Sequence, residues 1–210
     1  MQRRAVRLVD YQDARYAARY EALVRKVAEC EAGVMGAPGA LTKAVATYYF
    51  KLLAYKDEYE VARLYTHPSF RRSLEEAFEG DFTIEFNMAP PFFQSRDPQT
   101  GRYKKRPLGP WALHLFRFLA RCKRLRGTKF DLFGYATHRR IERQLIAEYE
   151  QTIGTLLGGL KPSSHGLAVE IAALPEEIRG YDTVKEESIR KAERKRQRLL
   201  TKFTELQIAN

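Results

Sequence analysis

The sequence predicts a mainly α-helical fold with a small antiparallel β-sheet, or hairpin insertion, at about residues 81–106. Apolar residues recur at steps of three and four along most of the chain, and the period changes to two only between Phe82 and Met88. Glycine and proline clusters separate the periodic stretches. Because no internal repeat or low-complexity linker divides the chain, we expect a single helical domain over residues 1–210.

The N-terminal part of the chain predicts three helices. Residues 11–31 place apolar side chains such as Tyr20 and Val27 on one helical face. A breaker cluster at residues 33–39 precedes a longer helix, in which apolar residues recur from Val45 to Ala62. Thr66, His67 and Pro68 then fit a capped helix start with proline in the first turn, and Gly80 ends this third helix.

The β-structure is predicted by alternation. Phe82, Ile84, Phe86 and Met88 alternate with polar residues, as in a half-buried strand. The segment 97–101, Asp-Pro-Gln-Thr-Gly, has the composition of a turn and closes the predicted hairpin.

Further helices follow the sheet. The helix that opens at Gly109–Pro110 is expected to pack through one apolar stripe, formed by Leu115, Phe118, Leu119, Cys122 and Leu125. Further periodic stretches predict helices over 141–158 and from Ser163 or Ser164 to Leu174. A last basic helix spans about 184–207, and it can extend from the domain.

Positive charge is concentrated in one part of the chain. The whole sequence has 37 Lys and Arg against 26 Asp and Glu, a formal charge of +11, and residues 94–129 hold eleven basic side chains against one acid. This segment is open to three interpretations: a solvated face, a docking surface for another protein subunit, or a nucleic-acid contact. The residues of the candidate docking face are Arg102, Lys104, Lys105, Arg106, Arg117, Arg121 and Arg124.

The residues that usually carry chemistry are few and scattered. Cys30 and Cys122 have no CxxC partner, and no two of the histidines have a metal-ligand spacing; these are His67, His114, His138 and His165. We therefore assign no catalytic, cofactor-binding or metal-binding residue. No run of 18 apolar residues occurs and the N-terminus is charged, which together predict a cytoplasmic protein without a membrane span.

Short segments along nearly the whole chain, about residues 8–200, resemble a known family in their order. They are DYQDARYAARY at 10–20, YFKLLAYKDEYEVARLY at 49–65, FEGDF at 78–82, MAPP at 88–91, RDPQTGR at 96–102, GPW at 109–111, LRGT at 125–128, FGY at 133–135 and LPEEIRGY at 174–181. This series resembles the C-terminal region of the long, fused form of indolepyruvate ferredoxin oxidoreductase, a member of the 2-oxoacid:ferredoxin oxidoreductases.

The resemblance implies a place in a larger enzyme. Such an enzyme oxidatively decarboxylates aryl-2-oxoacids on thiamine diphosphate, forms an acyl-coenzyme A and passes electrons through iron–sulfur clusters to ferredoxin. The cofactor-binding portions of that family lie upstream of the matched region, so no catalytic residue carries over to this chain.

Our leading expectation is a non-catalytic accessory or assembly domain that packs on the catalytic portion of such an oxidoreductase. The alternative is a free-standing basic module that binds nucleic acid, the less favoured partner. The sequence leaves open whether the chain forms a homo-oligomer.

Overall fold

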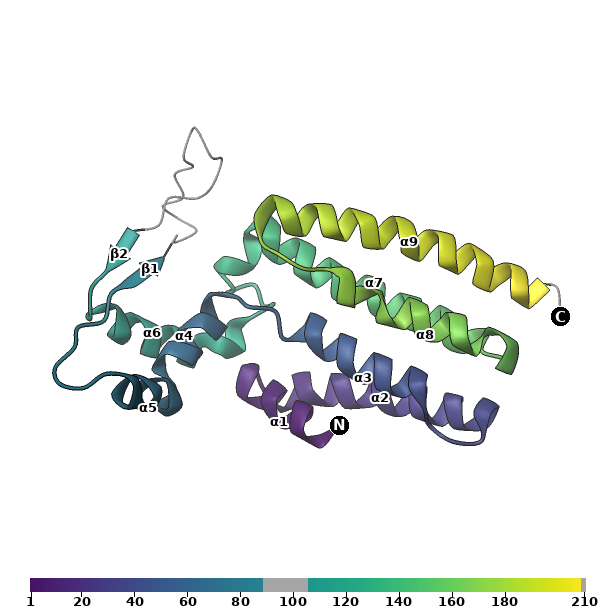
Figure 1. The fold of residues 1–210 in the computed structure, drawn as a ribbon, viewed down its shortest axis with the longest axis horizontal. Helices are drawn as coiled ribbons and strands as arrows, with labels where there is room; N and C mark the ends of the chain where they lie inside the picture. The colour runs from purple at the N-terminus through teal and green to yellow at the C-terminus, as the bar shows by residue number, and fades with distance from the viewer. Residues whose placement is uncertain (89–105, 209–210) are drawn as a thin grey trace. The chain divides into compact units, whose positions relative to one another are not determined.

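The computed structural model describes residues 1–88 and 106–208 of the chain, which is mainly α-helical with a small two-stranded sheet, as the sequence predicts (Figure 1). The described residues form two compact units, where the sequence alone suggested one domain. Unit 1 holds residues 1–55 and 141–208, and unit 2 holds residues 56–88 and 106–140. Among these residues, we find no helix with the length and apolar composition that crossing a membrane requires.

Unit 1 is a helical bundle built from both ends of the chain. Its helices are α1 (Gln2–Tyr11), α2 (Ala14–Met35), α3 (Ala40–Leu53), α7 (Thr137–Gly158), which begins in unit 2, α8 (His165–Ala173) and α9 (Asp182–Ile208). The helix α2 packs against α1 and α3, and α8 contacts α3 and α9. The buried side chains of Leu199 and Phe203 join α9 to the core of this unit.

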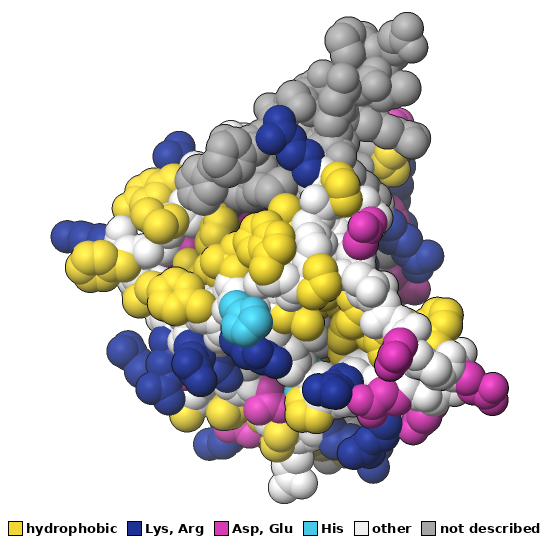
Figure 2. Space-filling view, turned by 90° about the vertical axis from the view of Figure 1, so that its left-hand side faces the viewer, with side chains coloured by type: hydrophobic (Ala, Val, Ile, Leu, Met, Phe, Trp, Pro, Cys, Tyr) yellow, Lys and Arg dark blue, Asp and Glu magenta, His cyan; other side chains and the backbone are white. Residues whose placement is uncertain are grey.

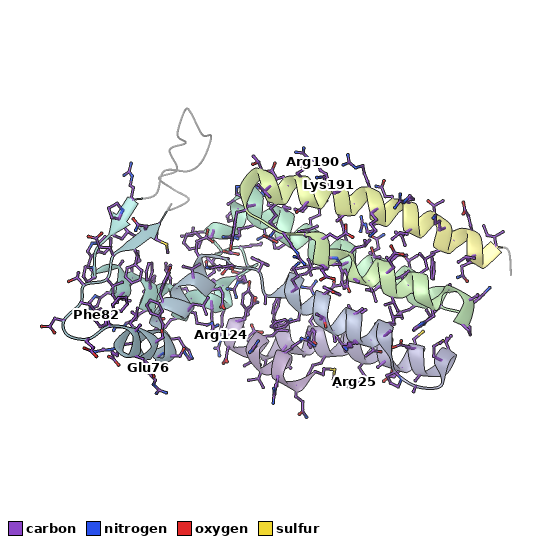
Figure 3. The ribbon with its side chains drawn as sticks, viewed as in Figure 1. Arg25, Glu76, Phe82, Arg124, Arg190 and Lys191 are labelled. Carbon is purple, nitrogen blue, oxygen red and sulfur yellow. The ribbon has the colours of Figure 1, made fainter. Side chains whose placement is uncertain are left out.

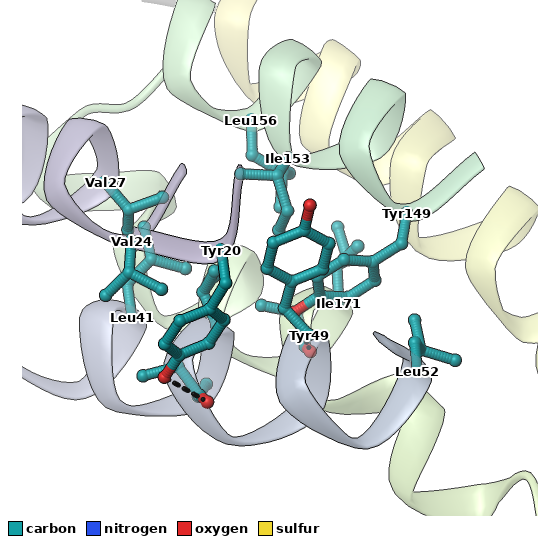
Figure 4. Close-up of a cluster of buried hydrophobic side chains, with 14 of the residues drawn as sticks. Tyr20, Val24, Val27, Leu41, Tyr49, Leu52, Tyr149, Ile153, Leu156 and Ile171 are labelled. Atoms are coloured by element: carbon teal, nitrogen blue, oxygen red, sulfur yellow. Dashed lines mark hydrogen bonds between the residues drawn. The ribbon is translucent and has the colours of Figure 1, made fainter. Parts of the chain in front are cut away.

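Stacked tyrosines fill the centre of unit 1 (Figure 4). The ring of Tyr49 lies between those of Tyr20 and Tyr149, with centroid distances of 6.0 and 5.9 Å. The hydroxyls of Tyr20 and Tyr149 each donate to a backbone carbonyl at 2.9 Å, and Tyr49 donates to the carboxylate of Glu150. Because a buried hydroxyl without a partner costs about 1–3 kcal/mol, this pairing lets the core use large aromatic side chains without that penalty.

A buried carboxylate organises the turn between α2 and α3. The side chain of Glu31 is fully buried and accepts hydrogen bonds from the amides of Gly39, Leu41 and Thr42 at 2.7–2.9 Å. It also accepts from the Thr42 hydroxyl at 2.6 Å and lies 2.7 Å from Nε2 of His165 on α8. Burial alone would raise the pKa of Glu31, but these hydrogen bonds outweigh it and lower the pKa to about 2. The ionised carboxylate thus caps α3 and ties it to α8.

Unit 2 has a smaller core. It contains α4 (Glu58–Thr66), α5 (Pro68–Ala77), the strands β1 (Phe86–Met88) and β2 (Arg106–Leu108), α6 (Ala112–Arg121) and the short 3-10 turns η2 (Cys122–Leu125) and η3 (Phe133–Tyr135). The strands are antiparallel, with Phe86 opposite Leu108 and Met88 opposite Arg106. The fully buried residues of this core are Ala62, Phe86, Ala112 and Phe116.

Two helices differ from the sequence-based expectation. The helix α1 was not expected, because its charged residues mask the short buried series Ala5, Leu8 and Tyr11. The predicted helix over 45–62 is two helices, because the chain leaves α3 at Ala54 and Asp57 caps a new helix by accepting from the Glu60 amide at 2.8 Å.

The predicted sheet is confirmed only at its ends. Alternation suggested a strand from Phe82, whereas pairing with β2 begins at Phe86. The predicted turn at 97–101 lies outside the described residues.

Candidate docking surface

The helix α6 is held in unit 2 by one narrow side. Its first turn begins with the Ala112 amide donating to the Gly109 carbonyl at 3.0 Å. Ala112 and Phe116 are buried, and the Phe116 ring packs edge-on against Phe86 at 5.1 Å and stacks on Tyr65 of α4 at 5.8 Å. These contacts orient the rest of the α6 surface.

Part of the apolar stripe that the sequence assigned to the core faces solvent instead. Leu115 is 43% exposed, Phe118 62% and Leu125 37%, and Trp111 at the start of the helix is 60% exposed. At about 100° per residue, Trp111, Leu115 and Phe118 lie within about 60° of one another. The prediction of internal packing is therefore wrong for Leu115, Phe118 and Leu125, whereas Leu119 of the same stripe is partly buried against the unit 2 core. The core is filled mainly by the neighbouring apolar side of α6, which contains Phe116.

A basic side runs beside the exposed apolar stripe. Arg117, Arg121 and Arg124 are all exposed, as the sequence predicts, and none pairs with a carboxylate that the structure describes. Figure 3 labels Arg124. Figure 2 shows hydrophobic side chains gathered on one face of the molecule with Lys and Arg beside them. We call the exposed side chains of Trp111, Leu115, Phe118 and Leu125 together with these three arginines the α6 face.

The other predicted docking residues are not part of this face as described. Arg106 is exposed at the start of β2. Arg102, Lys104 and Lys105 lie outside the described residues. The structure therefore brings together three of the seven candidate residues.

Arg126, which belongs to the same basic segment of the sequence, has a structural role. Its guanidinium is buried and binds Asp57 through two hydrogen bonds of 2.5 and 2.8 Å, and it lies 5.5 Å from the centre of the Tyr59 ring. The Tyr59 hydroxyl donates to the buried carboxylate of Asp131 at 3.1 Å. No local sequence pattern indicated this network, since 69 positions separate Asp57 from Arg126.

Asp131 in turn fixes the loop that follows α6. Its carboxylate accepts from the Gly127 amide at 2.7 Å and from the Gly134 amide at 2.9 Å. Gly127 has a φ of 76°, a conformation that favours glycine. Between these anchored points the loop holds Phe130 and Leu132 outward, 75% and 68% exposed.

A groove of about 600 Å³ opens in unit 2 between α5 and α6. Its apolar lining includes Phe70, Leu74 and Leu113. Asp81 and Phe82 line it from the α5 side, and Arg117 lines it from α6. The α6 face therefore borders a concave surface.

Comparison with family models gives one match, described as "Family of unknown function (DUF6537)", over residues 1–198. The chain belongs to the DUF6537 family. Comparison with curated proteins finds no match. Comparison with solved structures finds none either.

Histidine and cysteine are the residue types of this DUF6537 chain that could ligate a metal ion or react with a substrate. Within them, no three His, Cys, Asp or Glu side chains lie close enough to hold a metal ion together. His67 caps α5 by accepting from the Ser69 amide, and His165 contacts Glu31, so both have structural partners. Cys30 and Cys122 form no disulfide and are half-buried. Among the described residues, the α6 face is one of the exposed surfaces of this DUF6537 chain that combine large apolar side chains with charge.

Proposed function

We propose that this chain is a non-catalytic accessory or assembly domain of an indolepyruvate (2-oxoacid):ferredoxin oxidoreductase, and that its α6 face docks on the catalytic portion. The observation that carries the docking role is the exposure of Trp111, Leu115 and Phe118 beside arginines without described ion-pair partners. The ordered series of segments that resembles the C-terminal region of the fused enzyme supports the choice of partner.

The energetics of the α6 face favour a protein partner. Burying a large apolar side chain contributes about 1.5–3 kcal/mol, and exposed apolar patches rimmed by polar residues mark interaction sites. Tryptophan and arginine are the residues enriched among binding hot spots. The complementary surface is therefore apolar with acidic residues at its rim, which the three arginines would steer and orient.

The cofactors of the whole enzyme belong to its catalytic portion. Thiamine diphosphate and iron–sulfur clusters would be held there, and we assign no residue of this chain to either group. The contribution of this chain is then to position or stabilise the catalytic portion.

Binding in trans tests this proposal. The immobilised chain is exposed to the separately produced catalytic portion of an indolepyruvate ferredoxin oxidoreductase and, in a parallel arm, to duplex DNA and single-stranded RNA. We expect saturable binding of the catalytic portion, weakened at least about tenfold by the double change Leu115→Ser and Phe118→Ser.

A matched control comes from unit 1. Val6 and Val9 on α1 are also exposed, and Val6→Ser with Val9→Ser should leave binding unchanged. The proposal is overturned if the wild-type chain does not bind the catalytic portion. Salt-sensitive retention on nucleic acid in its place would favour the basic nucleic-acid-binding module.

A further inference from the structure

Unit 2 has a second exposed surface, of opposite charge to the α6 face. The helix α5 contains no buried residue, and the two aromatic side chains that follow it, Phe78 and Phe82, are 58% and 41% exposed. Their rings lie 6.0 Å apart. Residues 75–85 hold five acidic side chains and no basic one, and one of the five, Glu75, pairs with Arg71 of α5 at 2.8 Å. We call residues 75–82 the acidic knob; Figure 3 labels Glu76 and Phe82 within it.

The acidic knob and the α6 face are complementary in two respects. The segment 112–130 contains no acid, and four of its basic side chains are exposed, the reverse of residues 75–85; these are Arg117, Arg121, Arg124 and Lys129. Both surfaces also expose aromatic side chains, Phe78 and Phe82 on the knob and Trp111 and Phe118 on α6. Opposite charge around apolar centres is the pattern that a specific interface combines.

Both surfaces border the same groove. Asp81 and Phe82 line it from the knob, and Arg117 lines it from α6. They therefore open toward a common side of unit 2. A two-fold interface needs such an arrangement, because each copy must present both halves to the other at once.

We propose that two copies of this chain pair through unit 2, the acidic knob of each copy lying on the α6 face of the other. Two-fold symmetry repeats the contact between knob and α6 face, so both surfaces of both copies are occupied. The dimer is therefore closed, and no surface is left to bind further copies into a filament. The pairing goes beyond the proposed function and uses the chain alone. Since the catalytic portion would use the same α6 face, it and the second copy compete.

The chain contains a built-in probe of this interface. Trp111 is its only tryptophan and lies on the α6 face. Sedimentation velocity over a dilution series reports the oligomeric state, and Trp111 emission reports whether this face is covered. We expect a dimer with blue-shifted emission at high concentration, and monomers with red-shifted emission on dilution or at high salt.

Charge reversal identifies the two halves. One variant carries Arg117→Glu with Arg121→Glu, and the other carries Glu76→Lys with Glu79→Lys. Each should raise the dimer dissociation constant at least about a hundredfold, because the two-fold axis repeats every change. All four side chains are exposed, so unchanged circular dichroism and melting are expected.

Mixing the two reversed variants gives the decisive result. Each is a monomer alone, but together they restore opposite charges at both contacts and should form a one-to-one heterodimer. The control Arg25→Glu with Lys26→Glu, on the exposed side of α2, changes net charge equally and should remain a dimer. A wild-type chain that is monomeric at every concentration, reversals that leave dimerisation unchanged, or a mixture that stays monomeric would each overturn the proposal.

Discussion

Units 1 and 2 use their aromatic residues in opposite ways. In unit 1 the rings of Tyr20, Tyr49 and Tyr149 are stacked inside the core, and their hydroxyls have hydrogen-bond partners. In unit 2 a small core leaves Trp111 and Phe118 exposed, together with other large apolar side chains. Apolar surface of this kind is stabilised only when another molecule covers it and removes it from water. The difference shows that unit 1 encloses its large aromatic side chains, whereas unit 2 leaves several of them at the surface, which is the observation behind the docking role that we propose for unit 2.

Buried charge also differs between the units. Unit 1 buries one carboxylate, Glu31, surrounded by hydrogen-bond donors. Unit 2 buries the ion pair of Arg126 and Asp57 and, beside it, Asp131. Desolvation offsets much of the attraction in a buried ion pair, so the pair contributes conformational specificity more than net stability. In unit 2 that specificity fixes the loop after α6.

The largest expected effect is the removal of the buried pair in unit 2. Asp57→Ala leaves the Arg126 guanidinium buried without its bidentate partner and removes the cap of α4, which should destabilise unit 2 by about 3–5 kcal/mol. Hydrogen exchange should show lost protection in α4 and α6, with α2 and α3 unchanged.

The control for Asp57→Ala lies on the same helix. Glu60→Ala removes the partly buried pair with Arg63 and should cost about 1 kcal/mol, well below the cost of Asp57→Ala. Equal loss of protection in both units would contradict the separation of the two cores.

A smaller effect is expected from the buried carboxylate of unit 1. Glu31→Gln should destabilise unit 1 by about 2–3 kcal/mol at neutral pH, because hydrogen bonds to a charged acceptor become weaker ones to a neutral amide. The folded pKa of about 2 lies below the ordinary value of 4.5, so ionised Glu31 stabilises the protein above about pH 4.5. That contribution is lost as the pH falls toward 2.

Denaturant unfolding at pH 7 and pH 3 measures how much the ionised Glu31 carboxylate stabilises the protein. The difference in stability between wild type and Glu31→Gln should be smaller at pH 3. Glu29→Gln, an exposed change on the same helix, should follow the wild type at both values. An undiminished difference at pH 3 would show that ionisation of Glu31 is not the stabilising term.

The smallest expected effect distinguishes the two apolar sides of α6. Leu115→Ser with Phe118→Ser should change the free energy of unfolding by less than about 0.5 kcal/mol for each substitution, because both side chains are exposed. By contrast, Phe116→Ala should cost about 3–5 kcal/mol. Thermal unfolding of the variants checks this, and a large loss from the serine pair would restore the core stripe that the sequence predicted.

The sequence predicts the buried face of a helix correctly where the helix has a single apolar stripe. On the last helix, α9, one apolar series is buried and includes Ala192, Leu199 and Phe203. On α6 two apolar sides compete, and periodicity alone cannot tell which one meets Tyr65 and Phe86 in the core. The break within the predicted helix over 45–62 has a sequence signal, because Asp57 followed by Glu60 is a typical helix start and marks the beginning of α4.

The candidate site was predictable in its charge but not in its shape. Arg117, Arg121 and Arg124 are exposed as expected from their spacing. Arg126 belongs to the same basic run, yet its burial depends on Asp57, a partner that only the fold brings near. The acidic knob is also visible in the sequence, but its position across a groove from Arg117 depends on how α5 and α6 pack.

The central claim, that the α6 face is a docking surface, is tested most directly by the salt dependence of binding to the catalytic portion. The affinity of the wild-type chain is compared with that of a variant carrying Arg117→Gln, Arg121→Gln and Arg124→Gln, which keeps the apolar stripe. We predict that wild-type affinity falls as salt rises, and that the variant binds more weakly at low salt with a flatter dependence. Equal affinity and equal salt dependence would show that the arginines only solvate the surface, and would contradict the account.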